Sequence, residues 1–60
     1  MDKKQKIEVI LDDFRQTELR RLENEDSFKR VHNVYVNTMF FRDRLETFSE
    51  NNLDLIISKL

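Results

Sequence analysis

The chain contains no cysteine, glycine or proline among its 60 residues, and alanine is absent as well. Without cysteine it can form no disulfide, and with a single histidine it offers no set of nitrogen or sulfur ligands for structural zinc. Without glycine and proline it lacks the residues that most often mark tight turns and interrupt helices. These absences favour helices over strands, and they remove two usual means of stabilising a very small domain.

The charges nearly cancel, since 11 basic and 12 acidic side chains give a formal net charge of −1. A chain with so little net charge produces no overall field that would draw it to nucleic acid or to an anionic membrane. No apolar run approaches the roughly 18 residues of a membrane-spanning helix, and the basic start leads into an amphipathic segment instead of a signal sequence. We therefore expect a cytoplasmic protein with no membrane partner.

The length of the chain limits how stable a monomer can be. Residues 1–60 allow a single small domain and no more. A folded chain of this size buries only about 60% of the surface that its unfolded form exposes, so a monomeric core is marginal. Because disulfides and metals are excluded, association with another chain is the remaining source of stability. We expect a homo-oligomer, most simply a dimer.

Three helices are predicted along the chain, with these approximate bounds: 3–23, 27–48 and 50–59. At the start of the first helix, Asp2 followed three residues later by Gln5 has the pattern of a capping box. Apolar residues then recur every three or four positions, which is typical of one buried helix face: Ile7, Ile10, Leu11, Phe14 and Leu22. Glu18 falls within that face, and we expect it at the edge or against a basic residue of a neighbouring helix.

The polar segment 23–27 is the best break in the chain. In the absence of glycine, Asn24 is the residue best suited to the left-handed conformation that often ends a helix. Asp26 or Ser27 can then cap the next helix. A connection of this length suits two antiparallel helices in a hairpin. One continuous helix through the segment is the alternative, but it would need a heptad seam that the sequence lacks.

The second helix carries two apolar stripes, whereas a surface helix ordinarily has one. The main stripe steps by three and four residues and is expected to pack on the first helix: Val31, Val34, Tyr35, Thr38, Phe41, Leu45 and Phe48. The second stripe follows i, i+4 and i+8 spacing with a methionine beside it: His32, Val36, Met39 and Phe40. The two stripes face different directions, so the second needs a cover that the first helix cannot provide.

The third helix has a clear start. Ser49 is a good N-cap, and Phe48 before it is spaced from Leu53 as a hydrophobic staple. Its apolar face comprises four residues: Leu53, Ile56, Ile57 and Leu60. A helix of about three turns is hardly stable alone in water. It must lie on an apolar surface, and the second stripe of the preceding helix is the nearest candidate.

The predicted fold class is all-α: an antiparallel helical hairpin plus a short C-terminal helix, assembled into a helical-bundle dimer. The alternative is a monomeric three-helix bundle in which the third helix folds back over the second stripe. Methionine and phenylalanine at an uncovered stripe suit helix-in-groove contacts, because they are large and adaptable. We therefore predict a surface that binds a second copy or another protein, formed by His32, Val36, Met39 and Phe40.

Catalytic residues are not indicated by the sequence. One histidine is too few for a Ser–His–Asp set to be inferred, no glycine-rich loop is present to hold phosphate, and no ligand set indicates a metal or other cofactor. Sixty residues also leave little room for a water-excluding pocket. We expect a non-enzymatic regulatory protein that binds another macromolecule and blocks or bridges it.

A small nucleic-acid-binding regulator is the first alternative. It would use the basic residues near the turn between the first two helices: Arg20, Arg21, Lys29 and Arg30. Acidic residues are interleaved with this group and cancel most of its potential. The third helix is also too apolar to read bases.

A peroxisomal protein is the second alternative, because the last three residues spell an import signal, Ser58-Lys59-Leu60. Such a signal requires a free C-terminus that a receptor can grip. Leu60 is instead expected to pack with the apolar face of the third helix.

Overall fold

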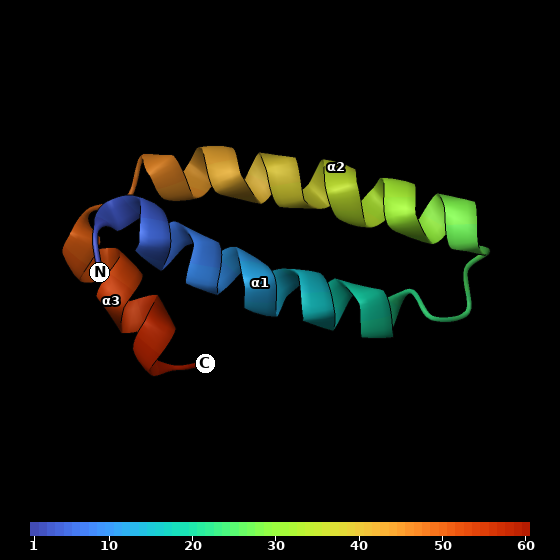
Figure 1. The fold of residues 1–60 in the computed structure, drawn as a ribbon, viewed down its shortest axis with the longest axis horizontal. Coiled ribbons are helices and arrows are strands. Elements are labelled where there is room, and N and C mark those ends of the chain that lie inside the picture. The colour runs from blue at the N-terminus through green and yellow to red at the C-terminus, as the bar shows by residue number, and fades with distance from the viewer.

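The computed structural model describes all 60 residues and contains three helices joined by short connections. Helix α1 spans Lys3–Arg21, α2 spans Ser27–Glu46 and α3 spans Glu50–Ser58. Helices α1 and α2 run antiparallel as a hairpin, and α3 lies beside the N-terminal end of α1 (Figure 1). The all-α prediction is confirmed, and each helix ends slightly earlier than predicted.

Side-chain caps begin all three helices. Asp2 accepts a hydrogen bond from the backbone N–H of Gln5, whose side chain accepts one from the backbone N–H of Asp2, so the predicted capping box is present. Asp26 caps α2, and Ser49 caps α3 by accepting from the N–H of Asn52. Each cap satisfies a backbone donor that the helix leaves unpaired, and losing one costs about 1 kcal/mol.

The turn between α1 and α2 differs from the prediction at Asn24. No residue of the chain has a positive φ, so Asn24 does not adopt the left-handed conformation. Leu22 caps the end of α1, and its carbonyl accepts a hydrogen bond from the Glu25 N–H at 3.0 Å. This hydrogen-bonded turn reverses the chain through residues of negative φ, which is why no glycine is needed there.

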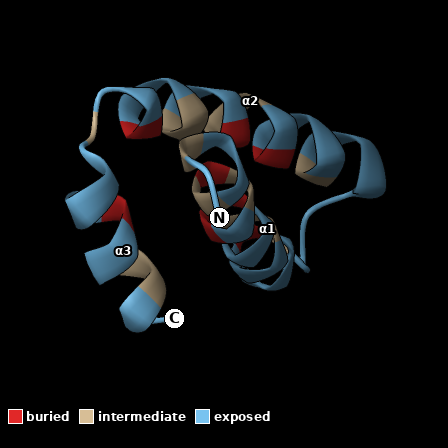
Figure 2. Ribbon diagram, turned by 60° about the vertical axis from the view of Figure 1, so that its left-hand side comes forward, coloured by how far each residue is buried: buried red, intermediate tan, exposed pale blue.

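The hydrophobic core lies where the three helices meet, at the end of the hairpin that holds the N-terminus (Figure 2). Leu11 of α1, Leu45 of α2 and Leu53 of α3 are fully buried. They form one cluster with Ile7 and Ile10. Only 8 of the 60 residues are buried, so the core is small and most of the hairpin is only two helices thick.

Helix α3 packs on α1 and leaves the second stripe of α2 uncovered, so the alternative in which α3 folds back over this stripe is wrong. Leu53 of α3 is fully buried in one cluster with Leu11 of α1, and this apolar contact holds α3 in place.

Lys6 of α1 adds two partly exposed ion pairs, with its Nζ 3.0 Å from Asp54 Oδ1 and 3.5 Å from Glu50 Oε1. These carboxylates raise the pKa of Lys6, chiefly through the hydrogen bond to Asp54. Lys3 of α1 also donates a hydrogen bond from its Nζ to the backbone carbonyl of Glu46, the last residue of α2, at 2.8 Å.

Glu18 is the only acidic residue that is buried, and it connects the two long helices. Its carboxylate accepts hydrogen bonds from Arg21 at 2.8 and 2.9 Å and from the side-chain amide of Asn37 at 3.1 Å. The basic partner is thus on the same helix, and the contact to the neighbouring helix is an amide. The bonds from Arg21 hold the pKa of Glu18 below its ordinary value, although burial opposes them.

The buried Glu18 makes the stability of the hairpin depend on acid pH. A carboxylate whose folded pKa is lowered stabilises the fold above its unfolded pKa, about 4.3 for glutamate, and this stabilisation is lost as the pH falls through the folded pKa. Glu18→Gln is expected to cost about 1 kcal/mol at neutral pH, because a neutral amide accepts weaker hydrogen bonds. The variant should then lose less stability in acid than the unchanged chain does.

Thermal melts followed by circular dichroism between about pH 3 and pH 7 measure this difference. Asp12→Asn is the matched control, since Asp12 is exposed on the same helix. An equal acid-induced loss of stability in the unchanged chain and in Glu18→Gln would contradict the assigned role of Glu18.

Candidate functional site

Much of α2 is exposed (Figure 2), and many of its exposed side chains are large and apolar. Five large side chains on this helix keep more than half of their area exposed: Phe28 81%, Val31 61%, Tyr35 65%, Met39 51% and Phe40 65%. Single exposed apolar residues are common on proteins, whereas a concentration of large ones on one element is less usual and makes this helix the candidate site. We call these five residues the α2 apolar face.

The predicted main stripe of α2 is only partly buried. Val34, Thr38 and Leu45 are buried, but Val31 and Tyr35 of the same stripe are exposed. The stripe spans about 140° of the helix at 100° per residue. Helix α1 covers only part of that arc, so the edge of the stripe that carries Val31 and Tyr35 stays exposed to solvent. The exposed surface is therefore larger than the second stripe alone.

The four predicted binding residues lie on α2 but not at one point. His32 is exposed and stacks on Phe28, with ring centroids 6.3 Å apart and an interplanar angle of 8°. Val36 is half-buried. Met39 lines a groove toward α1, whereas Phe40 lines a second hollow. The stripe pattern missed Phe28, although its i, i+4 spacing to His32 was a signal that it belongs to the same surface.

The groove lies between α1 and α2 and has a volume of about 390 Å³. Leu19 of α1 lines one side of it, and Val31, Tyr35 and Met39 of α2 line the other. Thr38, which also lines the groove, is buried and donates its hydroxyl to the backbone carbonyl of Val34 at 2.6 Å. The groove is therefore apolar over most of its length, and the hydroxyl in its lining already has a partner.

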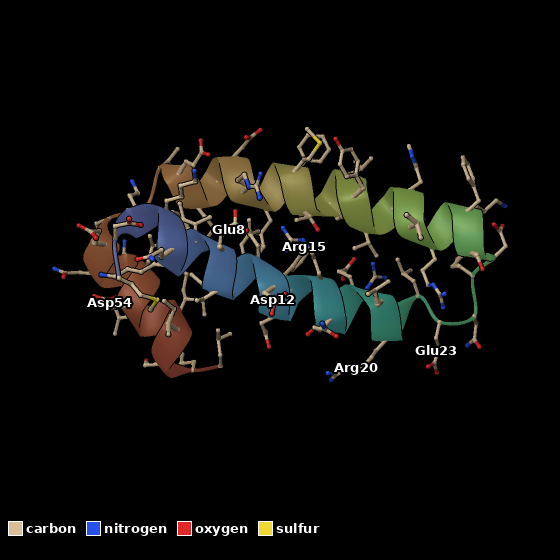
Figure 3. The ribbon with its side chains drawn as sticks, in the orientation of Figure 1. Glu8, Asp12, Arg15, Arg20, Glu23 and Asp54 are labelled. Atoms are coloured by element: carbon tan, nitrogen blue, oxygen red, sulfur yellow. The ribbon has the colours of Figure 1, made fainter.

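Two arginines lie at the more charged part of the groove, and both contact Glu8 of α1. Arg42 Nη2 is 2.8 Å from Glu8 Oε1, and Arg15 Nη2 is 3.7 Å from Glu8 Oε2. Figure 3 shows Glu8 and Arg15 in the space between the two helices. Because these ion pairs are partly exposed, they add little stability, and their main effect is to hold the Arg42 guanidinium beside the apolar wall.

The second hollow, of about 380 Å³, lies along another side of α2. It is lined by Phe14 of α1 with Phe40, Phe41 and Arg44 of α2. The rings of Phe14 and Phe41 lie 4.8 Å apart at an interplanar angle of 57°. Tyr35 and Phe40 are about 140° apart around α2. The groove and this second hollow can therefore contact two different molecules.

The basic residues near the turn do not form a free cluster. Arg21 donates two hydrogen bonds to Glu18, and this contact raises the pKa of Arg21. Arg20 points away from α2 (Figure 3). Lys29 is exposed in the first turn of α2, and Arg30 is half-buried with its Nε lacking a hydrogen-bond partner. Arg21 is thus engaged by Glu18 and Arg20 lies on the side of α1 away from α2 (Figure 3), and nucleic-acid binding by this group stays a prediction.

The C-terminal tripeptide is arranged differently from the prediction. Leu60 is 57% exposed and does not pack with the apolar face of α3. Helix α3 ends at Ser58, whose hydroxyl donates to the backbone carbonyl of Leu55 at 2.7 Å. The signal-like tripeptide thus begins inside the helix and continues beyond it, and peroxisomal targeting stays a prediction.

None of the three helices combines the length and the apolar content that crossing a membrane requires. The chain matches no protein-family model, no curated protein and no solved structure. Because these comparisons indicate no function, the functional proposal rests on the exposed apolar side chains of α2.

Proposed function

We propose that the protein is a small non-enzymatic regulatory protein that forms a homodimer and binds another protein, each through a part of the α2 apolar face. The observation that carries this function is the lack of cover over α2, since neither α1 nor α3 packs over this face. Large aromatic side chains and methionine are enriched where proteins bind one another. Covering one such side chain is favourable by about 1.5–3 kcal/mol, so a contact that covers several of them is favoured.

The proportions of the chain support a homodimer. It exposes 4675 Å², whereas a folded monomer of its mass exposes about 4,200 Å² on average. Its radius of gyration is 12.4 Å, against about 10 Å for a compact domain of equal length. The molecule measures 37 × 20 × 14 Å, so it is long and thin. Two such hairpins side by side would make a four-helix bundle, in which the α2 helices of the two copies contact each other.

A protein partner fits the α2 apolar face better than nucleic acid does. Of the basic residues near the turn, Arg21 is paired with Glu18, and Arg20 points away from α2 (Figure 3). The net charge of −1 gives the chain no overall attraction to phosphates. The hollow beside Phe40 is lined by aromatic rings that can receive an apolar side chain of a partner helix. Arg44 at the same hollow can pair with a carboxylate of that partner. Such binding would block or bridge the partner without any reaction by this chain.

Replacing Phe40 with glutamate is expected to weaken partner binding by at least roughly 30-fold, because a central aromatic contact is worth about 2 kcal/mol or more. Phe40 is 65% exposed, so the carboxylate should leave the helices intact. Affinity capture from a lysate of the source organism, followed by mass spectrometry, identifies the partner. Calorimetry with the purified partner then measures the dissociation constant.

Asn51→Glu is the matched control, since Asn51 is an exposed polar residue on α3 and does not line the hollow beside Phe40. It carries the same added charge and should retain the partner. Retention of one protein by the unchanged chain, by Phe40→Glu and by the control alike would contradict the proposed binding surface. Loss of the helical circular dichroism signal in Phe40→Glu would also contradict it, because Phe40 would then belong to the folding core.

A further inference from the structure

We infer that the groove between α1 and α2 receives a second copy of the chain, with the two α2 helices antiparallel about a two-fold axis at Tyr35. This docking rests on the homodimer proposed above and adds which surface each copy uses and in which direction the helices run. The hollow beside Phe40 then stays free for the other protein. Helix α3 packs on α1 and does not cover the groove.

The exposed side chains of α2 are arranged symmetrically about Tyr35. Val31 and Met39 lie four residues before and after it, and Phe28 and Arg42 lie seven residues before and after it. Offsets of four and seven residues keep side chains on one side of a helix. We call these five residues the Tyr35 strip. A two-fold contact requires such symmetry, because its axis places each residue of the strip opposite another residue of the strip on the second copy.

Antiparallel docking about Tyr35 brings together side chains that suit one another. Val31 of each copy meets Met39 of the other, so a short branched side chain faces a long adaptable one. The two Tyr35 rings meet at the axis, where they can stack with an offset. Phe28 meets the guanidinium of Arg42, which can lie over the face of the ring as a cation–π pair.

A parallel arrangement of the same strips would be unfavourable. It would place the two Arg42 guanidinium groups side by side, and like charges at a partly covered contact repel one another. Glu8 holds each Arg42 within its own hairpin at 2.8 Å, so the guanidinium is not free to swing away without losing that ion pair. The charge of the strip therefore selects the antiparallel direction.

The area of the surface is close to what the smallest stable dimers bury. An aromatic side chain has about 150–250 Å² to bury. Phe28 and Tyr35, exposed by 81% and 65%, therefore offer roughly 200–350 Å² per chain by the same measure. Val31, Met39 and Leu19 of the groove wall enlarge this area, as do the stems of the two groove arginines. The total approaches the roughly 600 Å² per chain that is the lower limit for a stable interface.

Single cysteines test this interface, because the chain has no cysteine of its own. Packed helix axes lie about 8–10 Å apart, and the Cα atoms lie about 2.3 Å from each axis. Two Cα atoms at the two-fold axis are then about 4–5 Å apart, which is within reach of a disulfide. We expect Tyr35→Cys to form a disulfide-linked dimer in mild oxidant at high protein concentration, which offsets the loss of the ring contact. Asn33→Cys, exposed on another side of α2, should stay unlinked.

An equimolar mixture of Val31→Cys and Met39→Cys tests the direction. In the antiparallel dimer these two variants link to each other but not to themselves, because residues 31 of the two copies lie about 12 Å apart along the axis. Self-linking of Val31→Cys would identify a parallel dimer and overturn the inference. The cross-linked fraction is read from non-reducing gels.

Light scattering of the unmodified chain separates the remaining outcomes. If the unmodified chain is a dimer but none of the cysteine variants links, the second copy contacts another surface. That result would overturn the inference and leave the proposed homodimer standing. A monomer that still binds its partner through Phe40 would overturn both the inference and the homodimer, while the proposed partner binding would stand.

Discussion

Replacing Tyr35 with glutamate is expected to raise the dissociation constant of the dimer by at least roughly 30-fold. Because Tyr35 lies at the proposed two-fold axis, one substitution removes both rings of the central contact. Losing that shared aromatic contact costs about 2 kcal/mol or more, which is a factor of about 30 or more in affinity. The two new carboxylates would also face each other in an apolar contact, which adds to the effect. Sedimentation equilibrium over a range of concentrations measures the constant.

Two variants control for other causes of this effect. Tyr35→Phe keeps the ring and should keep the dimer. Asn33→Glu adds the same charge to another side of α2, where the residue is exposed, and should change the dissociation constant little. Equal weakening by Asn33→Glu and Tyr35→Glu would mean that net charge, and not the Tyr35 strip, determines association.

Replacing Leu11 with alanine is expected to unfold a large fraction of the chains at room temperature. Leu11 is fully buried, and it belongs to the cluster that joins all three helices. Removing such a side chain costs about 2–5 kcal/mol. A single core in a chain of this size rarely supplies more than about 3–5 kcal/mol. The substitution therefore removes most of the free energy of unfolding, and urea titration followed by circular dichroism measures it.

Leu55→Ala is the control for Leu11→Ala, because it removes the same atoms at a side chain that is 60% exposed. Its free energy of unfolding should lie within about 0.5 kcal/mol of the unchanged chain. Both variants are compared at one protein concentration, since dimerisation stabilises the fold by mass action. Equal losses in the two variants would show that Leu11 is not part of the stabilising core.

The starts of the helices could be predicted from the sequence because their signals are local. Each capping side chain lies three residues before the backbone N–H that it caps, and such short spacing can be recognised in the sequence: Asp2, Asp26 and Ser49. The ends were harder to predict, because no glycine marks them. Leu22 caps α1 with an ordinary backbone conformation that many residues adopt.

The position of α3 could not be predicted from local patterns. It depends on Leu53 reaching Leu11 in the core and on Lys6 pairing with Asp54, and both pairs are more than forty residues apart along the chain. The apolar face of α3 fits either long helix, so periodicity alone favoured the nearer one. Contacts between distant segments decided the outcome, and they appear only when the fold is known.

The candidate site was predictable in part. The spacing of Met39 and Phe40 identified α2 as the helix with too much apolar surface, and both are more than half exposed. Val31 and Tyr35 were assigned to the core, because periodicity does not say how wide an arc a neighbouring helix covers. The symmetry about Tyr35 is present in the sequence, but it gains physical meaning only once these side chains are known to be exposed.

The most direct test of the proposed function is sedimentation equilibrium of the unmodified chain at micromolar concentration. A homodimer predicts a mass twice the 7.4 kDa of one chain, falling toward the single-chain value on dilution. A well-folded species with the mass of one chain at every concentration would contradict the homodimer, and α2 would then be left exposed in the free protein.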